Sequence, residues 1–363
     1  MSRTFELTRG LMGRAVLEGV FPGAVLLVAK AGRVLFHEAF GMRRLLPEPL
    51  PAHEGTVFDL ASLTKPLATA LSCGVFLAGQ RRLSFRLPLA EFFPDAPRPL
   101  ASVTLAQLLS HVSGLPALRN YFHRLVAAPE GERRGVLVEL ALQEPLVAAP
   151  GTVACYSDLG YILLGAVLEK TSGLGLDDLA ARLLYEPLGL GLHFRPTGGQ
   201  APAVELAATE QCPLRGRVLE GEVHDENCWA AGGVCGHAGL FGTAAEVAAL
   251  LLHLRAVVRD GAEGPVAPGT LRRMMARRRL PRLTTWGLGF DHPNKVGSSA
   301  GRYFSRRSVG HLGFTGCSFW MDLSDNDLLV VLLTNRVHPS RHHEGIKGFR
   351  PRLHEAVFKE ATV

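Results

Sequence analysis

The 363-residue sequence has no long apolar run, no paired-cysteine motif and few lysines. Its longest apolar stretches, such as 24–29 and 328–333, have the length of a strand and fall well short of the ~20 residues that span a bilayer. Residues 1–23 contain several charges and lack the continuous apolar segment of an export signal. The sequence therefore predicts a cytoplasmic protein with no membrane partner.

The six cysteines, at positions 73, 155, 212, 228, 235 and 317, form no Cys-x-x-Cys pair and no metal-finger spacing. In a reducing compartment such cysteines are expected to be free, buried thiols. The net charge of +6 comes from 39 basic and 33 acidic residues, but only 6 of the basic residues are lysines. An arginine bias of this kind does not indicate nucleic-acid binding, so no nucleic-acid partner is predicted.

The sequence contains enough apolar residues for a core, since 47% of its residues are hydrophobic. Its length corresponds to about two structural units. Two strand-like runs lie near each end, at 24–30 and 34–40 and at 317–323 and 328–334. Helical periodicity occurs in eight segments, which are 5–20, 67–77, 105–109, 134–142, 159–171, 176–184, 244–259 and about 343–360.

Because two isolated hairpins are each marginally stable in water, the strands from the two ends are expected to pair into one sheet. The predicted fold class is α/β, with an antiparallel sheet flanked by helices and built from both chain ends. Residues 1–65 and 300–363 would form this sheet domain, and residues 66–299 an inserted, mainly helical domain. The functional site is expected in the cleft between them.

The first motif that carries chemistry is Ser-x-x-Lys, formed by Ser62 and Lys65 at the start of a helical pattern. The spacing of three residues places a hydroxyl and an amine on one helix face. A serine hydroxyl becomes a good nucleophile when a neighbour accepts its proton, and lysine does so efficiently only if its pKa falls well below ~10.4. Pro66 cannot donate a helical hydrogen bond, so Ser62 is expected at the helix entrance. A motif this short also occurs by chance.

Two further segments combine polar residues with turn signals. Tyr156 and Asp158 precede a helical pattern, where Asp158 is also suited to be an ordinary N-cap. His311 and Gly313 lie in a glycine-rich entry into a strand, which by itself is more often a turn or a bulge than a site. Neither segment is decisive alone.

Taken in order, four short motifs resemble the serine β-lactamase and penicillin-binding protein superfamily, and its class C-like branch in particular. They are Ser62-x-x-Lys65, the LSHVSGLP segment at 109–116, Tyr156-x-Asp158 and His311-x-Gly313. The segments FPGA at 21–24, VHDEN at 223–227 and GHAGLF at 236–241 resemble the same branch. The resemblance covers nearly the whole chain, and several motifs in the right order do not readily coincide by chance.

The resemblance implies a serine hydrolase that works through an acyl-enzyme. Ser62 would attack a carbonyl carbon, Lys65 and Tyr156 would share the proton transfer, and water would hydrolyse the resulting ester. Backbone N–H groups of Ser62 and Phe314 would form the oxyanion hole. The expected substrate-binding and oxyanion residues are Asp158, His311, Gly313 and Phe314.

Two residues depart from the usual family pattern. Asp158 stands where many relatives have Asn, and a carboxylate beside Lys65 holds the amine protonated, which favours Tyr156 as the working base. His311 stands where lactamases have Lys, and a largely neutral histidine binds a substrate carboxylate weakly. Strong β-lactamase activity is therefore not expected.

The small-molecule substrate predicted by these residues is an ester, a D-amino-acid peptide or amide, or a β-lactam. The alternative is a catalytically impaired binding protein that senses peptidoglycan fragments or β-lactams. No cofactor and no metal are predicted, because the spacing of polar residues at 224–226 and 237 fits a structural loop better than a ligand set. His111 is expected to be structural, and Arg336 to form a surface ion pair or to meet a substrate carboxylate. No oligomeric state is predicted.

Overall fold

Both ends of the chain contribute strands to one antiparallel sheet in the computed structural model, which describes residues 5–78, 84–198, 205–278 and 284–362. The six strands lie in the order β3-β2-β1-β11-β10-β9. Their bounds are β1 Gly23–Lys30, β2 Arg33–Arg44, β3 Leu50–Pro51, β9 Val309–Leu312, β10 Ser318–Met321 and β11 Leu328–Thr334. β1 pairs with β11 from Ala24 opposite Thr334 to Lys30 opposite Leu328. The predicted pairing of the terminal strands is confirmed.

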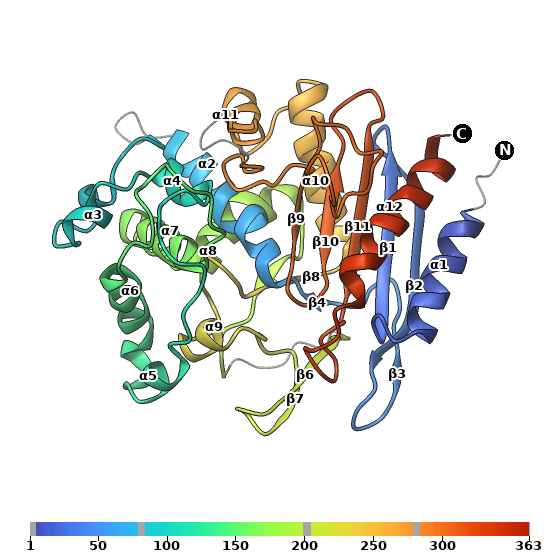
Figure 1. Ribbon diagram of the computed structural model, residues 1–363, viewed down its shortest axis with the longest axis horizontal. Coiled ribbons are helices and arrows are strands. Elements are labelled where there is room, and N and C mark those ends of the chain that lie inside the picture. Colours follow the sequence, from blue (N-terminus) through green and yellow to red (C-terminus); the bar gives the residue numbers. More distant parts are fainter. Residues whose placement is uncertain (1–4, 79–83, 199–204, 279–283, 363) are drawn as a thin grey trace.

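The central strands are buried on both faces, because each face of the sheet packs against its own set of helices. In β1, Leu26 and its alternate neighbours belong to a core with helices α1 (Glu6–Leu17) and α12 (Gly345–Thr362). Val25 and Leu27 point to the other face and belong to the larger core of the inserted region. Figure 1 shows α1 and α12 side by side on the outer face, with both chain ends nearby. Continuous apolar strands are expected for a sheet covered on both faces.

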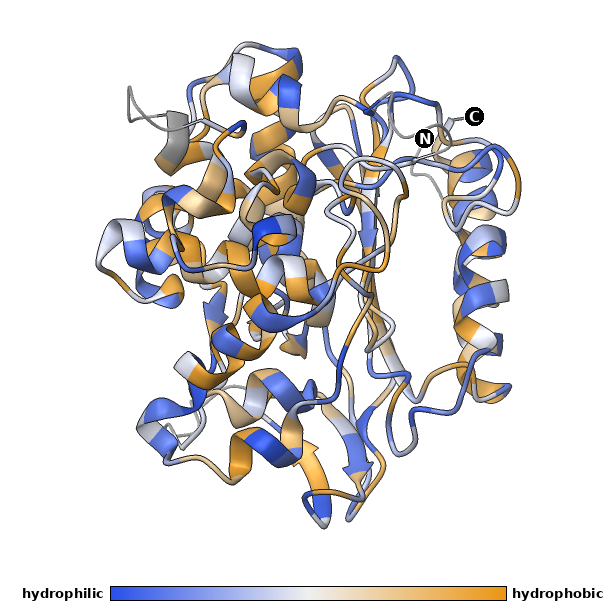
Figure 2. Cartoon of the chain, turned by 60° about the vertical axis from the view of Figure 1, so that its left-hand side comes forward, coloured by the Kyte–Doolittle hydropathy of each residue, from blue (hydrophilic) through white to orange (hydrophobic). Residues whose placement is uncertain are grey.

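The inserted region is mainly helical, as predicted, and also contains short strands. Its helices are α2 Leu71–Ala78, α3 Arg98–Ala101, α4 Leu105–Leu109, α5 Phe122–Val126, α6 Arg133–Gln143, α7 Asp158–Ser172, α8 Leu176–Ala180, α9 Glu226–Ala230, α10 Ala244–Arg259 and α11 Pro268–Met274. Its strands β8 Leu240–Gly242 and β5 His193–Phe194 form one sheet with β4 Phe58–Asp59, which precedes residue 66, and β6 Ala208–Cys212 and β7 Arg217–Glu220 form another. Figure 2 shows hydrophilic and hydrophobic residues interleaved along the helices, the pattern of elements that bury one face.

Helix α10 connects the inserted region to the large sheet. Nε of Arg255 donates to Oδ1 of Asp327 at 2.8 Å, and Nη1 of Arg259 donates to the carbonyl oxygen of Leu323 at 2.9 Å. Both acceptors lie in the hairpin between β10 and β11. The division into domains at residues 65 and 300 stays a prediction, and α10 packs on strands β1 and β11 of the sheet.

None of the described helices is long and apolar enough to cross a membrane. All six cysteines are unpaired, and all but Cys155 are buried.

Candidate active site

Ser62 lies on a short, strained turn that follows β4. The turn is one 3₁₀ turn over Ala61–Leu63, and Ala61 has a φ of 47°, a left-handed conformation that alanine rarely adopts. The carboxylate of Asp59 accepts a hydrogen bond from the Ala61 N–H at 2.8 Å and so holds this conformation next to Ser62. Lys65 begins a π-helical segment, with Pro66 in its first turn. The predicted place of Ser62 at the helix entrance is confirmed.

The Lys65 side chain is completely buried and contacts three other segments. Its Nζ lies 3.1 Å from Oγ of Ser62, 3.0 Å from the carbonyl oxygen of His237 and 2.6 Å from Oδ1 of Asp158. Burial lowers the pKa of Lys65, but the charges and hydrogen bonds of Asp158 and Tyr156 outweigh burial and raise the pKa above its ordinary value. The amine is therefore protonated in the resting site.

Tyr156 and Asp158 lie at the entrance of α7 and face Lys65. The N-cap of α7 is Ser157, whose side chain accepts a hydrogen bond from the Gly160 N–H. The alternative that Asp158 is an ordinary cap is wrong, and its carboxylate pairs with Lys65 instead. Burial raises the pKa of Tyr156, and this effect together with the Asp158 charge outweighs the lowering by the Lys65 cation. The phenol is therefore protonated at neutral pH.

The His111 ring packs against the Tyr156 ring. Its Nδ1 accepts a hydrogen bond from the backbone N–H of Ser157 at 3.0 Å, and its ring centroid lies 4.5 Å from that of Tyr156. Burial and the nearby Lys65 cation lower the pKa of His111 well below its ordinary value, so the ring is neutral. The expectation of a structural histidine agrees with these contacts, which position the Tyr156 ring.

His311 and Gly313 lie at the end of β9, on the other side of the Ser62 turn. Nδ1 of His311 donates to the carbonyl oxygen of Leu312 at 2.9 Å, and burial together with Lys65 lowers the pKa of His311 to about 3. The ring is thus neutral, which agrees with the weak carboxylate binding predicted for it. A Cβ at Gly313 would lie 2.8 Å from the carbonyl oxygen of Leu60, so only glycine allows β9 to approach the nucleophile turn this closely.

These residues surround a cavity of about 660 Å³, large enough for a small organic substrate. The residues at its reactive end include Ser62, Tyr156, Asp158, Trp286, Asp291, His311, Gly313 and Phe314. The residues at its other end include Arg119, Asn120, His224, Glu226, Asn227 and Arg341. The structure therefore brings all seven site residues predicted from the sequence to one place, with Lys65 buried behind Ser62.

Comparison with known proteins identifies the family and relatives of this chain. The sequence matches the family described as Beta-lactamase over residues 6–349. The chain belongs to the beta-lactamase family. An N-acetylmuramyl-L-alanine amidase of Bacillus subtilis (strain 168) is 33% identical to this member over 353 residues, which cover 88% of the chain and 78% of the relative. A protein of Escherichia coli (strain K12), named provisionally as a D-alanyl-D-alanine carboxypeptidase, is 30% identical over 353 residues, covering 88% and 79%.

Solved structures show the same fold as this beta-lactamase family member. EstCE1, a hydrolase with promiscuous acyltransferase activity, superimposes with a TM-score of 0.76 at 23% identity and covers 97% of each chain. The octameric penicillin-binding protein homologue from Pyrococcus abyssi superimposes with a TM-score of 0.72 at 23% identity, covering 94% of this chain and 75% of that one. The predicted fold class and superfamily are confirmed.

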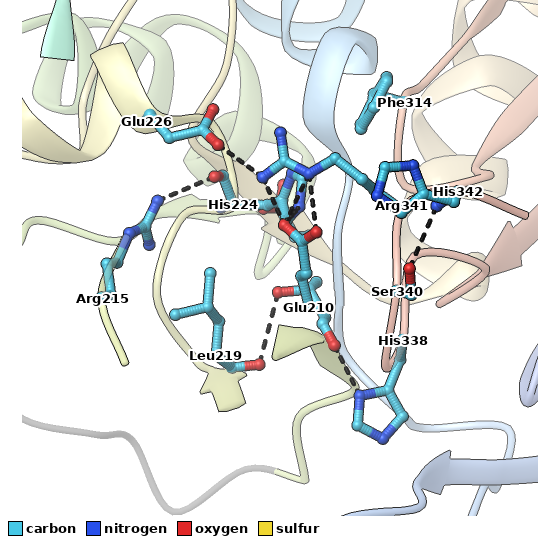
Figure 3. Close-up of polar contacts among 12 residues, drawn as sticks. Glu210, Arg215, Leu219, His224, Glu226, Phe314, His338, Ser340, Arg341 and His342 are labelled. Carbon is cyan, nitrogen blue, oxygen red and sulfur yellow. Dashed lines mark hydrogen bonds and ion pairs between the residues drawn. The ribbon is translucent and has the colours of Figure 1, made fainter. Parts of the chain in front are cut away.

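The far end of the cavity carries a network of charges, shown in Figure 3. Nε of Arg341 lies 2.8 and 2.7 Å from the two carboxylate oxygens of Glu210, and its Nη2 lies 2.5 Å from Oε1 of Glu226. Nε2 of His224 lies 3.1 Å from Glu210, and the His224 ring stacks on Phe314 with centroids 5.6 Å apart. The segment expected to be a structural loop thus also lines the cavity. Among the described residues, no group of three or more potential ligands could hold a metal ion.

We expect this network to stabilise the protein, and we expect its contribution to the free energy of unfolding to depend on pH. Burial raises the pKa of Glu210, but hydrogen bonds from His224 and Arg341 outweigh it and lower the pKa to about 2. A carboxyl whose pKa is lower in the folded than in the unfolded protein stabilises the fold at every pH above its ordinary pKa of 4.5. This stabilisation is lost as the pH falls through about 2. Glu210→Gln should lower the Tm by roughly 2–5 °C at pH 7, and the difference from the native protein should shrink toward pH 2. Calorimetry across this range measures it.

The matched control for this prediction is Glu130→Gln, because Glu130 is exposed and forms no ion pair among the described residues. Its Tm should follow that of the native protein at every pH. A constant Tm difference for Glu210→Gln from pH 7 to pH 2 would show that the carboxylate charge is not what stabilises the fold.

Several residues of the site carry no signal in the sequence. Trp286 and Asp291 reach the cavity from a segment more than a hundred residues from either Ser62 or Tyr156. Arg336 neither forms a surface ion pair nor lines the cavity: its Nε donates to the carbonyl oxygen of Phe314 at 2.9 Å, and its guanidinium lies 4.7 Å from that ring. The expected surface ion pair is wrong, because the side chain is buried and holds Phe314 instead, and contact with a substrate carboxylate stays a prediction.

Proposed function

We propose that this protein hydrolyses amides or esters through an acyl-enzyme on Ser62. One observation carries the proposal: Oγ of Ser62, at the wall of the cavity, lies 3.1 Å from the buried Nζ of Lys65, and both lie beside Tyr156. A nucleophile, a cation and a proton-accepting group in mutual reach are the requirements for nucleophilic catalysis by serine.

The charges of the site favour Tyr156 over Lys65 as the group that accepts the serine proton. Asp158 keeps Lys65 protonated, so the amine cannot accept the serine proton. The Lys65 cation and Ser62 both lower the pKa of Tyr156, although burial keeps it above its ordinary value. The phenol is protonated at rest, so in this proposal the fraction of Tyr156 that is ionised accepts the proton of Ser62 as Oγ bonds to the substrate carbonyl carbon, and the Lys65 cation stabilises that phenolate.

The remaining steps follow from this proton transfer. Negative charge develops on the carbonyl oxygen, where the N–H groups of Ser62 and Phe314 would stabilise it. Tyr156 then gives its proton to the leaving amine or alcohol, and the carbonyl carbon stays bonded to Ser62. Water attacks the ester carbonyl carbon and loses a proton to Tyr156. The bond between that carbon and Oγ then breaks, the acid is released, and Tyr156 returns its proton to Ser62.

Amides and esters without a carboxylate beside the scissile bond are the substrates that fit this site best. His311 is neutral and Lys65 is paired with Asp158, so neither offers a free cation to the carboxylate of a β-lactam. The name of one relative, an amidase, favours amide substrates with amino-acid components. The name of another, a provisional D-alanyl-D-alanine carboxypeptidase, implies a carboxylate beside the scissile bond, which this proposal does not expect here. Slow or absent β-lactam hydrolysis is part of the proposal.

Intact-mass spectrometry after incubation with a fluorophosphonate, and separately with a penicillin, tests the proposal on the native protein and on Ser62→Ala. We expect one stable fluorophosphonate adduct on the native protein, none on Ser62→Ala, and little penicillin adduct. Turnover of p-nitrophenyl acetate should be lost in the same variant. Ser113→Ala is the matched control, because Ser113 is buried outside the cavity lining and should leave labelling intact.

Two other results would point elsewhere. A native protein that neither reacts with the fluorophosphonate nor cleaves the ester would contradict the hydrolase and favour the binding-protein alternative. Rapid turnover of the penicillin would contradict the expected weak binding of a carboxylate.

A further inference from the structure

The charged side chains that line the cavity are paired with opposite charges, with one exception among the described residues. The pairs are Asp158 with Lys65, Asp225 with His237, Arg119 with Glu144, and Arg341 with Glu210 and Glu226. Asp291 lines the same cavity and forms no ion pair. The cavity therefore contains one carboxylate whose charge the described residues do not pair.

Asp291 is held rigidly at the reactive end. Its backbone N–H and carbonyl both bond to Gly310 of β9 at 2.9 Å, directly before His311. Oδ1 accepts a hydrogen bond from the backbone N–H of His292 at 2.9 Å. The Thr285 side chain also donates a hydrogen bond to this carboxylate, and the cation whose charge lowers its pKa is Arg277, whose Nε donates to the carbonyl oxygen of Thr284. Burial raises the pKa of Asp291 to about 6, so the carboxylate is mostly ionised at neutral pH.

Two groups beside Asp291, the His311 ring and the Trp286 ring, can also interact with a cationic ligand. Because Nδ1 of His311 donates to a carbonyl oxygen, the neutral ring carries its proton there, and Nε2 is an acceptor. This Nε2 is buried and has no hydrogen-bond partner among the described residues. Trp286 also lines the cavity, with its ring centroid 5.5 Å from that of His311. An indole ring attracts cations through its π face.

We propose that Asp291, with His311 and Trp286, binds a cationic amine of the substrate. A carboxylate, an acceptor nitrogen and an aromatic ring each interact favourably with an ammonium group, and none of them favours a carboxylate. This inference rests on the proposed hydrolase function and narrows its substrates to amides or esters that carry an ammonium group.

Binding without turnover tests the proposal on Ser62→Ala, which retains the cavity. The probes are two pairs of p-nitroanilides. In each pair one member carries an ammonium group and the other a hydroxyl group in its place: D-alanine against D-lactic acid, and 6-aminohexanoic acid against 6-hydroxyhexanoic acid. Calorimetry measures their binding. We expect one amine to bind about tenfold or more tightly than its hydroxyl partner, the contribution of a hydrogen bond to a charged group. Adding Asp291→Asn should reduce that ratio to near one. Adding Asp325→Asn, an exposed carboxylate with no ion pair among the described residues, should leave it unchanged.

Each outcome decides between the two proposals. Equal affinity for amine and hydroxyl probes, no detectable binding of the amines, or a preference that survives Asp291→Asn would overturn the amine site. Labelling of Ser62 by the fluorophosphonate is independent of these probes. If labelling fails while the Asp291-dependent preference is found, the hydrolase proposal fails and the cavity binds amines for another purpose.

Discussion

Replacing Lys65 by methionine is expected to lower kcat/KM for an ester substrate by about 10³-fold or more. Methionine fills a similar volume, but it removes the cation that contacts Ser62 and stabilises the Tyr156 phenolate. The variant also leaves Asp158 without its partner, which should lower stability by up to ~3 kcal/mol. Steady-state kinetics and urea unfolding measure the two effects separately.

The double variant Lys65→Met, Asp158→Asn separates catalysis from folding. Asparagine removes the unpaired charge, so this variant should regain most of the lost stability and none of the activity. Recovery of activity with stability, or a single variant within tenfold of native kcat/KM, would show that Lys65 is a structural residue.

Tyr156→Phe is expected to lower kcat/KM by roughly 10²- to 10⁴-fold, the usual contribution of a positioned acid or base. The pH profile adds a distinctive signature. Because the pKa of Tyr156 lies above its ordinary value, the fraction of ionised phenol grows about tenfold for each pH unit across the neutral range. The kcat/KM of the native protein should rise with pH accordingly, and that of Tyr156→Phe should not.

Tyr185→Phe is the matched control, because Tyr185 is a buried tyrosine whose hydroxyl donates to the Leu67 carbonyl oxygen outside the cavity. It should keep the native profile. A flat native profile from pH 6 to pH 9 would contradict the phenolate as base.

The candidate catalytic residues could be proposed from the sequence because their signals are local. Ser62-x-x-Lys65 brings two side chains together within one turn, and Tyr156-x-Asp158 places two more at a helix entrance, where both contact Lys65. Pro66 carries the same kind of information, since its missing N–H fits only the first turn. The fold class was predictable as well, because β1 and β11 are continuous apolar runs that only a sheet covered on both faces accommodates.

The charge states of Lys65 and His311 depend on tertiary contacts that no local sequence pattern predicts. The sequence showed that Asp158 stands near a motif lysine, but only the 2.6 Å contact between them establishes that Lys65 stays protonated. The neutral state of His311 likewise results from its burial and from the Lys65 cation, and these come from segments far apart in the chain.

The sequence by itself determined the family, the sheet built from both chain ends and the residues that we propose to react. These depend on hydrophobic periodicity and on spacings of a few residues, which survive any arrangement of the distant parts. Only the tertiary structure decided what surrounds the nucleophile: the strained Ala61 held by Asp59, the Arg336 side chain that supports Phe314, and the unpaired Asp291. The physical reason is that packing joins segments whose separation along the chain leaves no periodic trace, and pKa values follow from that packing.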